Sequence, residues 1–315
     1  APWFHAASHN NPNFAFSSLG GRWLLLAFLP PREGRADAML AQVEAHRHRF
    51  REDQVMVFPI TRDGARYARG HNGIGLRWFL DKGGAIARGY GALEAVGGEV
   101  GRWVLIDPSL RIHAWSDGPE GDAAFLYKVM ALPPPDDHAG VALHAPVLIT
   151  PRVLEPELCR RLIDLYETQG GEISGVMRDV GGKTVPIVDD FKRRRDCTIA
   201  GENLRTILRE RIAKRLLPDI AKAFQFRVTR IERYIVACYD AEEGGWFHPH
   251  RDNTTLGTAH RRFACSINLN AEDFDGGDLC FPEFGTRTYR PPTGGAVVFS
   301  CSLLHQATQV LRGRR

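Results

Sequence analysis

The chain has 315 residues, with 43% hydrophobic and 25% charged side chains, which is typical of a globular protein of about two domains. No apolar run reaches the about 18 residues that a membrane-spanning helix needs, and no secretory signal opens the sequence. We therefore expect a cytoplasmic protein with no membrane partner. Its 6 cysteines form no CxxC motif, which indicates free, buried thiols in a reducing compartment.

Strand-like and helix-like patterns alternate in residues 1–132, with short links between them. This alternation predicts an α/β domain, in which a central sheet is flanked by helices. The expected elements are strands at 21–28 and 54–60, a helix at 36–50, a strand, turn and short helix within 76–93, a hairpin at 101–115 around Asp107-Pro108, and a helix at 121–132.

A linker is expected at residues 133–146, because this stretch opens with PPPDDHAG. Consecutive prolines stiffen a chain, and the acidic residues and glycine that follow keep it in solvent. The patterns on the two sides of this stretch differ in kind, so the linker separates two domains.

Helices come first and strands follow in residues 147–315. Apolar residues recur at helical spacing over 156–168 and 202–224. From residue 227 onwards, short strand-like runs are separated by Gly and Pro. This order predicts an α+β domain, a jelly roll preceded by helices.

Basic residues are concentrated in this second half, in the run Lys192 to Arg195 and again between Arg205 and Arg215. The simpler interpretation is that they line solvated helix faces. The alternative is attraction for an acidic partner or for nucleic acid.

The first half resembles the thioredoxin-like peroxiredoxins in the segments APWF, GRWLLLAFLP, LDKGGAIARGYGAL and WVLIDPSLRI. In that family, the helix after the first strand carries the peroxidatic cysteine. The corresponding stretch here, PREGRADAMLAQ, contains no cysteine. A peroxidase without a thiolate cannot cleave peroxide, so we expect a scaffold for docking, for homodimer formation or for substrate placement.

The stretch FHPHRDN, residues 247–253, places a histidine and an acid two positions apart. Side chains at i and i+2 of a strand share one face, so His250 and Asp252 can reach one ion where the strand ends or bends. His305 is the expected third ligand, because the strand-like run GGAVVFS before it should lie beside the first ligand strand. Two histidines and one carboxylate that leave open positions are typical of a non-haem Fe(II) oxygenase.

Two other histidines compete for a role at this site. His248 shares the face of His250, and we expect it to face the substrate or to support the ligands. As a fourth ligand it would instead indicate a cupin-like metal protein. His260 is expected in an exposed loop beside Arg261.

An iron site of this kind needs a two-electron donor, and a 2-oxoacid can supply the electrons. The distal carboxylate of such an acid suits a bidentate arginine. The candidates in the run after His305 are Arg312, Arg314 and Arg315.

Residues 147–315 resemble the Fe(II)- and 2-oxoglutarate-dependent dioxygenases of the prolyl 4-hydroxylase type. The resemblance lies in VLITPRVLEPELCRRLIDLYE, YIVACYDAEEGGWFHPHRDN, SINLNAEDFDGGDLCFPEFG and PPTGGAVVFSCSLLHQATQVLRGRR. It implies a double-stranded β-helix with iron on His250, Asp252 and His305. It further implies that Arg315 binds 2-oxoglutarate with a strand tyrosine, Tyr239 or, as a second choice, Tyr234.

The same resemblance implies ascorbate as an optional reductant. It also implies one more strand beyond the arginine, so we expect the given sequence to stop short of the end of this domain.

The expected function is therefore hydroxylation of an unactivated C–H bond with molecular oxygen, in a prolyl, peptidyl, amino-acid or other small-molecule substrate. One alternative is a redox-type or cupin-like scaffold without oxygenase activity. Another is a nucleic-acid demethylase, although no interleaving of aromatic and basic residues marks a platform for stacking bases, so nucleic acid is a disfavoured partner.

Overall fold

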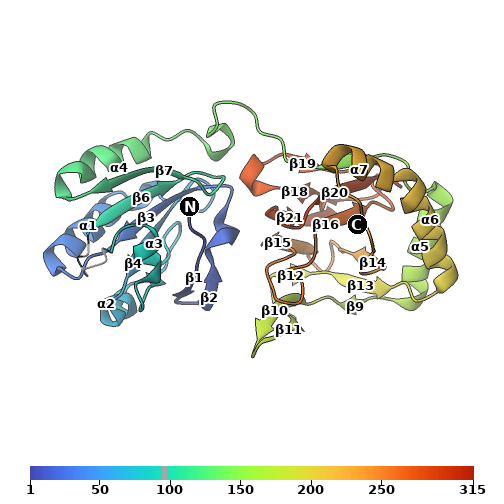
Figure 1. The fold of residues 1–315 in the computed structure, drawn as a ribbon, viewed down its shortest axis with the longest axis horizontal. Coiled ribbons are helices and arrows are strands. Elements are labelled where there is room, and N and C mark those ends of the chain that lie inside the picture. The colour runs from blue at the N-terminus through green and yellow to red at the C-terminus, as the bar shows by residue number, and fades with distance from the viewer. Residues whose placement is uncertain (94–97, 99) are drawn as a thin grey trace. The chain divides into compact units, whose positions relative to one another are not determined.

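The computed structural model describes residues 1–93, 98 and 100–315. The chain divides into two compact units (Figure 1). Unit 1 comprises residues 1–144 with 282–285, and unit 2 comprises residues 145–281 with 286–315. No helix within the described residues has the length and apolar character needed to cross a membrane.

Unit 1 is built on a seven-stranded sheet of order β2-β1-β5-β4-β3-β6-β7. The central strands β3 and β4 are parallel, whereas β6 and β7 form an antiparallel hairpin beside β3. The elements are β1 (His5–Ser8), β2 (Asn11–Ala15), β3 (Trp23–Phe28), α1 (Glu33–Ala45), β4 (Val55–Thr61), α2 (Gly64–Arg69), β5 (Phe79–Leu80), α3 (Ala85–Gly89), β6 (Arg102–Ile106), β7 (Ile112–Asp117) and α4 (Asp122–Met130). This sheet with helices beside it agrees with the α/β expectation for the first half.

All six residues of β3 are buried, because the strand has a hydrophobic core on each face of the sheet. Leu24 and Leu26 belong to one core, which α3 completes with Ile86 and Ala87. The alternate residues of the strand, Trp23, Leu25 and Ala27, belong to the other core, to which α1 and α4 contribute. A continuous apolar run therefore marks a strand that is covered on both faces.

A buried carboxylate, Asp122, links α4 to α1 through an ion pair and to β6 through a hydrogen bond. Asp122 is 6% exposed and accepts hydrogen bonds from Trp103 Nε1 at 2.8 Å and from Arg35 Nη2 at 2.9 Å. Breaking a buried pair leaves an uncompensated charge. We expect Asp122→Ala to destabilise unit 1 by about 3 kcal/mol.

Urea unfolding followed by circular dichroism measures this loss. The matched control is Asp53→Ala, since Asp53 is 66% exposed in its pair with Arg51 and such pairs contribute under about 1 kcal/mol. Equal losses in the two variants would show that the Asp122 pair adds nothing to stability.

Helices and several small sheets make up unit 2. Its core lies between α5 (Pro156–Gln169), α6 (Glu202–Arg215), α7 (Leu217–Phe224) and the strands. The sheets have the orders β12-β15-β21-β18-β19, β14-β13-β9, β16-β20-β8, β10-β11 and β17-β22. The strands are β8 (Leu148–Thr150), β9 (Glu172–Ile173), β10 (Val176–Val180), β11 (Lys183–Ile187), β12 (Lys192–Arg193), β13 (Arg195–Thr198), β14 (Ile235–Cys238), β15 (Trp246–His250), β16 (Phe263–Ile267), β17 (Asp275–Gly276), β18 (Leu279–Cys280), β19 (Thr288–Tyr289), β20 (Ala296–Ser300), β21 (His305–Ala307) and β22 (Val310–Arg312).

Three details of unit 2 differ from the sequence-based expectations. The helical pattern over 202–224 is split at Leu216, because Pro218 cannot continue α6 and instead opens α7. The run expected to be a strand from 227 forms one only from Ile235. Lys192 to Arg195 do not line a helix: they lie on β12, β13 and the residue between them, whereas Arg205 to Arg215 lie on α6 as expected.

The six cysteines all lie within the described residues and form no disulfide bond. Four of them are buried, as expected, whereas Cys238 is partly buried and Cys265 is exposed.

Candidate metal centre

Strand β15 presents His250 at the point where the strand ends. It lies between β12 and β21, and its pairing with β21 is irregular between Phe247 and His250. Pro249 lies in this irregular stretch, where its lack of an N–H group is tolerated. After the strand, the Asp252 N–H donates to the Cys301 carbonyl at 2.9 Å, which folds the acid back beside the histidine. The strand therefore ends between His250 and Asp252, as two ligands from HxD require.

His305 opens β21 and is the register partner of His250. The expectation that the GGAVVFS strand lies beside the first ligand strand is wrong. That strand is β20, and it pairs with β16 and β8. The chain turns between β20 and β21, and β21 then pairs with β15.

Three donor groups meet here: those of His250, Asp252 and His305 lie within 4.8 Å of one another. His250 Nε2 lies 3.4 Å from Asp252 Oδ1, and His305 Nε2 lies 3.6 Å from Asp252 Oδ2. No other group of three His, Cys, Asp or Glu side chains within residues 1–93, 98 and 100–315 is close enough to hold an ion.

Backbone carbonyls orient both rings. His250 Nδ1 donates to the His248 carbonyl at 2.8 Å, and His305 Nδ1 donates to the Leu303 carbonyl at 3.0 Å. A hydrogen bond at one ring nitrogen fixes the tautomer and leaves the other nitrogen free to coordinate. In both rings the free nitrogen is Nε2, the atom that faces Asp252.

The charges at the site suit a cation. Burial lowers the pKa of His305 to about 4, so this imidazole is neutral at pH 7. Burial raises the pKa of Asp252, but the hydrogen bond with His250 and the charges of His305 and Arg261 outweigh it and hold the pKa well below its usual range. A neutral imidazole and an ionised carboxylate are the protonation states that bind a metal.

Aromatic rings surround the two histidines. The ring of Phe247 stacks on His250, with centroids 3.4 Å apart. Phe299 and Phe281 contact the His305 ring, with centroids 4.6 and 6.2 Å away. These rings restrict the rotamers of both histidines and limit the access of water.

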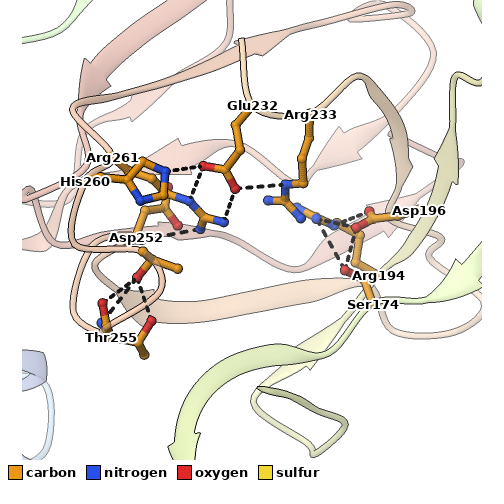
Figure 2. Close-up of polar contacts among 10 residues, drawn as sticks. Ser174, Arg194, Asp196, Glu232, Arg233, Asp252, Thr255, His260 and Arg261 are labelled. Carbon is orange, nitrogen blue, oxygen red and sulfur yellow. Dashed lines mark hydrogen bonds and ion pairs between the residues drawn. The ribbon is translucent and has the colours of Figure 1, made fainter. Parts of the chain in front are cut away.

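A polar network supports the backbone of Asp252. Arg261 Nη1 donates to the Asp252 carbonyl at 3.4 Å, and Glu232 holds the same guanidinium at 2.6 and 2.8 Å (Figure 2). The His260 side chain is 46% exposed, as expected, and its Nε2 lies 3.3 Å from a Glu232 carboxylate oxygen. Sequence reasoning missed Glu232, because nothing in its local pattern links it to residue 252.

His248 lies outside the group of three donors. Its ring contacts Phe191 and Trp246, with centroid distances of 5.4 and 5.7 Å. This position favours a supporting residue over a fourth ligand.

The arginine candidates differ in their partners. Arg312 pairs with Asp275 and is 65% exposed, and Arg314 pairs with Glu167 at 2.9 Å. Arg315 instead turns inward, where it donates to Ser266 Oγ at 3.3 Å and has no carboxylate at ion-pair distance within the described chain. A half-buried guanidinium without a counter-ion is suited to an anionic ligand.

Tyr239 lies next to this arginine. The Arg315 guanidinium is 5.4 Å from its ring centroid, and two backbone hydrogen bonds of 2.9 Å join the two residues. Tyr234 instead packs against the helical core, with Arg205 over its ring at 5.9 Å. The geometry thus favours Tyr239 over Tyr234 as the neighbour of the arginine.

Residues 234–315, which include all three donors and Arg315, match the family model of the 2OG-Fe(II) oxygenase superfamily. The family implies Fe(II) and 2-oxoglutarate as cofactors. The C-terminal part of the chain thus resembles these oxygenases, as predicted. The N-terminal part, which has no peroxidatic cysteine, resembles peroxiredoxin and thioredoxin structures, as predicted.

A PKHD-type hydroxylase of Cupriavidus metallidurans is 32% identical over 93 residues. The match covers 26% of this chain and 41% of that relative.

Two kinds of solved structure are similar to the chain. The prolyl-4-hydroxylase of Pseudomonas putida is 18% identical, with a TM-score of 0.39, over 57% of this chain and 91% of that one. The mitochondrial 2-Cys peroxiredoxin of Plasmodium falciparum is 17% identical, with a TM-score of 0.36, over 42% and 89%.

Proposed function

We propose that this protein is an Fe(II)- and 2-oxoglutarate-dependent oxygenase that hydroxylates an unactivated C–H bond of a small-molecule or peptide substrate. In the balanced reaction, R–H, O₂ and 2-oxoglutarate give R–OH, succinate and CO₂. The observation that carries the proposal is the convergence of His250, Asp252 and His305 within 4.8 Å.

The donor set fits Fe(II). Two imidazole nitrogens and one carboxylate on one side leave coordination positions open, whereas structural zinc sites usually have four protein ligands. His250, Asp252 and His305 would hold the iron. Bound Fe(II) and 2-oxoglutarate would supply the activation of oxygen, with the 2-oxoacid as the two-electron donor.

The residues of the chain position these groups and protect them. The Nδ1 hydrogen bonds hold the two imidazoles in one tautomer, and the network of Arg261 and Glu232 fixes the backbone of Asp252. Arg315, with Tyr239, would bind the distal carboxylate of 2-oxoglutarate. The aromatic rings beside the histidines would exclude water from the reaction.

Several further assignments belong to this proposal. The strands of unit 2 would form a double-stranded β-helix, with residues 1–132 and 147–315 as the domains on either side of a linker at 133–146. A prolyl or peptidyl substrate, ascorbate as an optional reductant and a cytoplasmic location extend the family resemblance. Unit 1 would serve in docking, homodimer formation or substrate placement.

Formation of succinate tests the activity without knowledge of the substrate. Purified protein with Fe(II), oxygen and 2-oxoglutarate should release succinate slowly even when no substrate is added. Chelation with EDTA should stop the release, and Fe(II) should restore it while Zn(II) should not, because zinc cannot supply the redox chemistry. Succinate is measured by liquid chromatography and mass spectrometry.

Protein that binds Fe(II) tightly but releases no succinate would contradict the oxygenase and favour a metal-binding scaffold. The His71→Gln variant is the matched control for nonspecific effects of histidine replacement, since His71 is exposed and belongs to unit 1. It should release succinate at the wild-type rate within about twofold.

A further inference from the structure

Two cationic side chains, Lys192 on β12 and Arg194 between β12 and β13, lie beside the candidate metal centre. Lys192, Arg194 and Asp196 all contact Ser174 Oγ, whereas Arg193 and Arg195 pair with Asp190 and Glu243. Lys192 is 6% exposed. Its Nζ donates to Ser174 Oγ at 2.6 Å and to the Gly175 carbonyl at 3.2 Å. Within the described chain, no carboxylate oxygen lies at ion-pair distance from this ammonium group.

Arg194 contacts the same serine as Lys192. Its guanidinium donates to Asp196 Oδ2 at 2.7 Å and to Ser174 Oγ at 3.4 Å (Figure 2). It also donates to Tyr239 Oη at 3.5 Å. The side chains of Arg194 and Asp196 are 14% and 15% exposed. Asp196 thus pairs with Arg194, and among the described residues Lys192 has no carboxylate at ion-pair distance.

Arg233 adds a third cation. Its charge acts directly on Lys192, and its nearest carboxylate oxygen, on Glu232, is 3.9 Å away. Glu232 forms a much shorter ion pair with Arg261, at 2.6 Å, so it neutralises Arg233 only weakly. We refer to Lys192, Arg194 and Arg233 as the cationic cluster.

The cluster adjoins the candidate metal centre. Lys192 Nζ lies 4.9 Å from the ring centroid of Phe247, the ring that stacks on His250. Strand β12 pairs directly with β15, so Lys192 and Phe247 are register partners. The charge of Asp252 also acts on Lys192.

A buried cation without a partner costs free energy unless an anion compensates it. In the proposed function, 2-oxoglutarate brings two carboxylates, of which one chelates the iron and the other binds Arg315. Neither is left for Lys192, so this ammonium group can accept an anionic group of another molecule at the site.

We propose that Lys192, assisted by Arg194 and Arg233, binds an anionic group of the substrate, so that the enzyme acts on molecules that carry a carboxylate or a phosphate near the reacting carbon. This inference deepens the proposed function and rests on it, because the bound anion is a substrate only if the protein is an oxygenase. Direct binding of an anion at Lys192 can be tested without turnover.

The first test measures thermal unfolding of the full chain with acetate or inorganic phosphate at constant ionic strength, with neutral acetamide as the control. The protein is loaded anaerobically with Fe(II) and 2-oxoglutarate, and the measurement is repeated without either. An anion at about ten times its Kd should raise the Tm of the wild type by about 3 °C. Lys192→Met should lose this shift, whereas Lys222→Met, on the exposed side of α7, should keep it.

Equal shifts in the wild type and Lys192→Met, or no shift in the wild type, would overturn the anion site. The readout is the anion-dependent change in Tm, which a purely structural role of Lys192 would not alter. A larger shift with phosphate than with acetate would assign a phosphorylated substrate, and the reverse would assign a carboxylate.

The second test uses succinate release in the presence of free amino acids and the corresponding amino-acid amides. The acids should stimulate release more than the amides, and Lys192→Met should raise the KM for the stimulating acid about 10- to 100-fold. Equal stimulation by both sets, or a KM effect on 2-oxoglutarate instead, would overturn the assignment to substrate. Anion binding that depends on Lys192 without any succinate release would reject the oxygenase and retain the anion site.

Discussion

Replacing Asp252 with alanine should abolish iron binding at the centre and stop succinate release. The carboxylate is the only negative charge among the three donors, and it lies 3.4 and 3.6 Å from the two imidazole Nε2 atoms. Without it, only two imidazoles remain as ligands. We expect the affinity for Fe(II) to fall at least about 100-fold, since even the loss of a group that merely supports a ligand costs about 10- to 100-fold. Titration with Fe(II) under anaerobic conditions measures the affinity.

Two further variants sharpen this test. Asp252→Glu keeps the charge but extends the side chain by one methylene, which moves the oxygen by more than the about 0.5 Å that a functional site tolerates. It should therefore also lose most activity. Asp190→Ala removes an acid that is 95% exposed and should behave as the wild type. Wild-type iron affinity in Asp252→Ala would rule out the proposed ligand set.

Replacing Arg315 with glutamine should raise the KM for 2-oxoglutarate about 10- to 100-fold with a smaller effect on kcat. The guanidinium has Ser266 as its hydrogen-bonding partner and no carboxylate at ion-pair distance in the described residues, so its charge is available to the distal carboxylate. Charge-assisted hydrogen bonds of this type contribute about 1.5–3 kcal/mol each. The rate of succinate formation at varied 2-oxoglutarate concentration gives both constants.

Arg312→Gln is the matched control, because Arg312 pairs with Asp275 on an exposed strand. Arg315→Lys should recover part of the affinity, since lysine keeps the charge but loses the bidentate geometry. An unchanged KM in Arg315→Gln would place the binding of 2-oxoglutarate elsewhere, and Arg194 would then be the next arginine to replace.

The sequence carries enough information for the donor set, because a strand has a period of two. HxD at a strand end brings two donors to one side, and a third histidine later in the chain completes the group. The structure brings these three side chains together. The central strands of unit 1 were also predictable, since buried runs such as that of β3 have no solvent-facing position.

The remaining features depend on tertiary pairing. Nothing local in GGAVVFS-CSLLH shows that β20 pairs with β16 while β21 pairs with β15. The strands at residues 192–195 could not be predicted from the sequence. Four successive cations show no alternation of apolar and polar residues, which is the pattern that indicates a strand. Glu232 supports Asp252 through Arg261, a contact between segments that no sequence pattern relates.

The pairing of His250 with His305 has a consequence for how the protein is made. The two imidazoles come from strands far apart in the chain, and β21 pairs with both β15 and β18. Such non-local pairing forms late, because the entropy of closing the loop is lost before the contacts compensate for it. A nascent chain therefore lacks the complete set of three candidate donors until His305 has been synthesised and β21 has paired with β15.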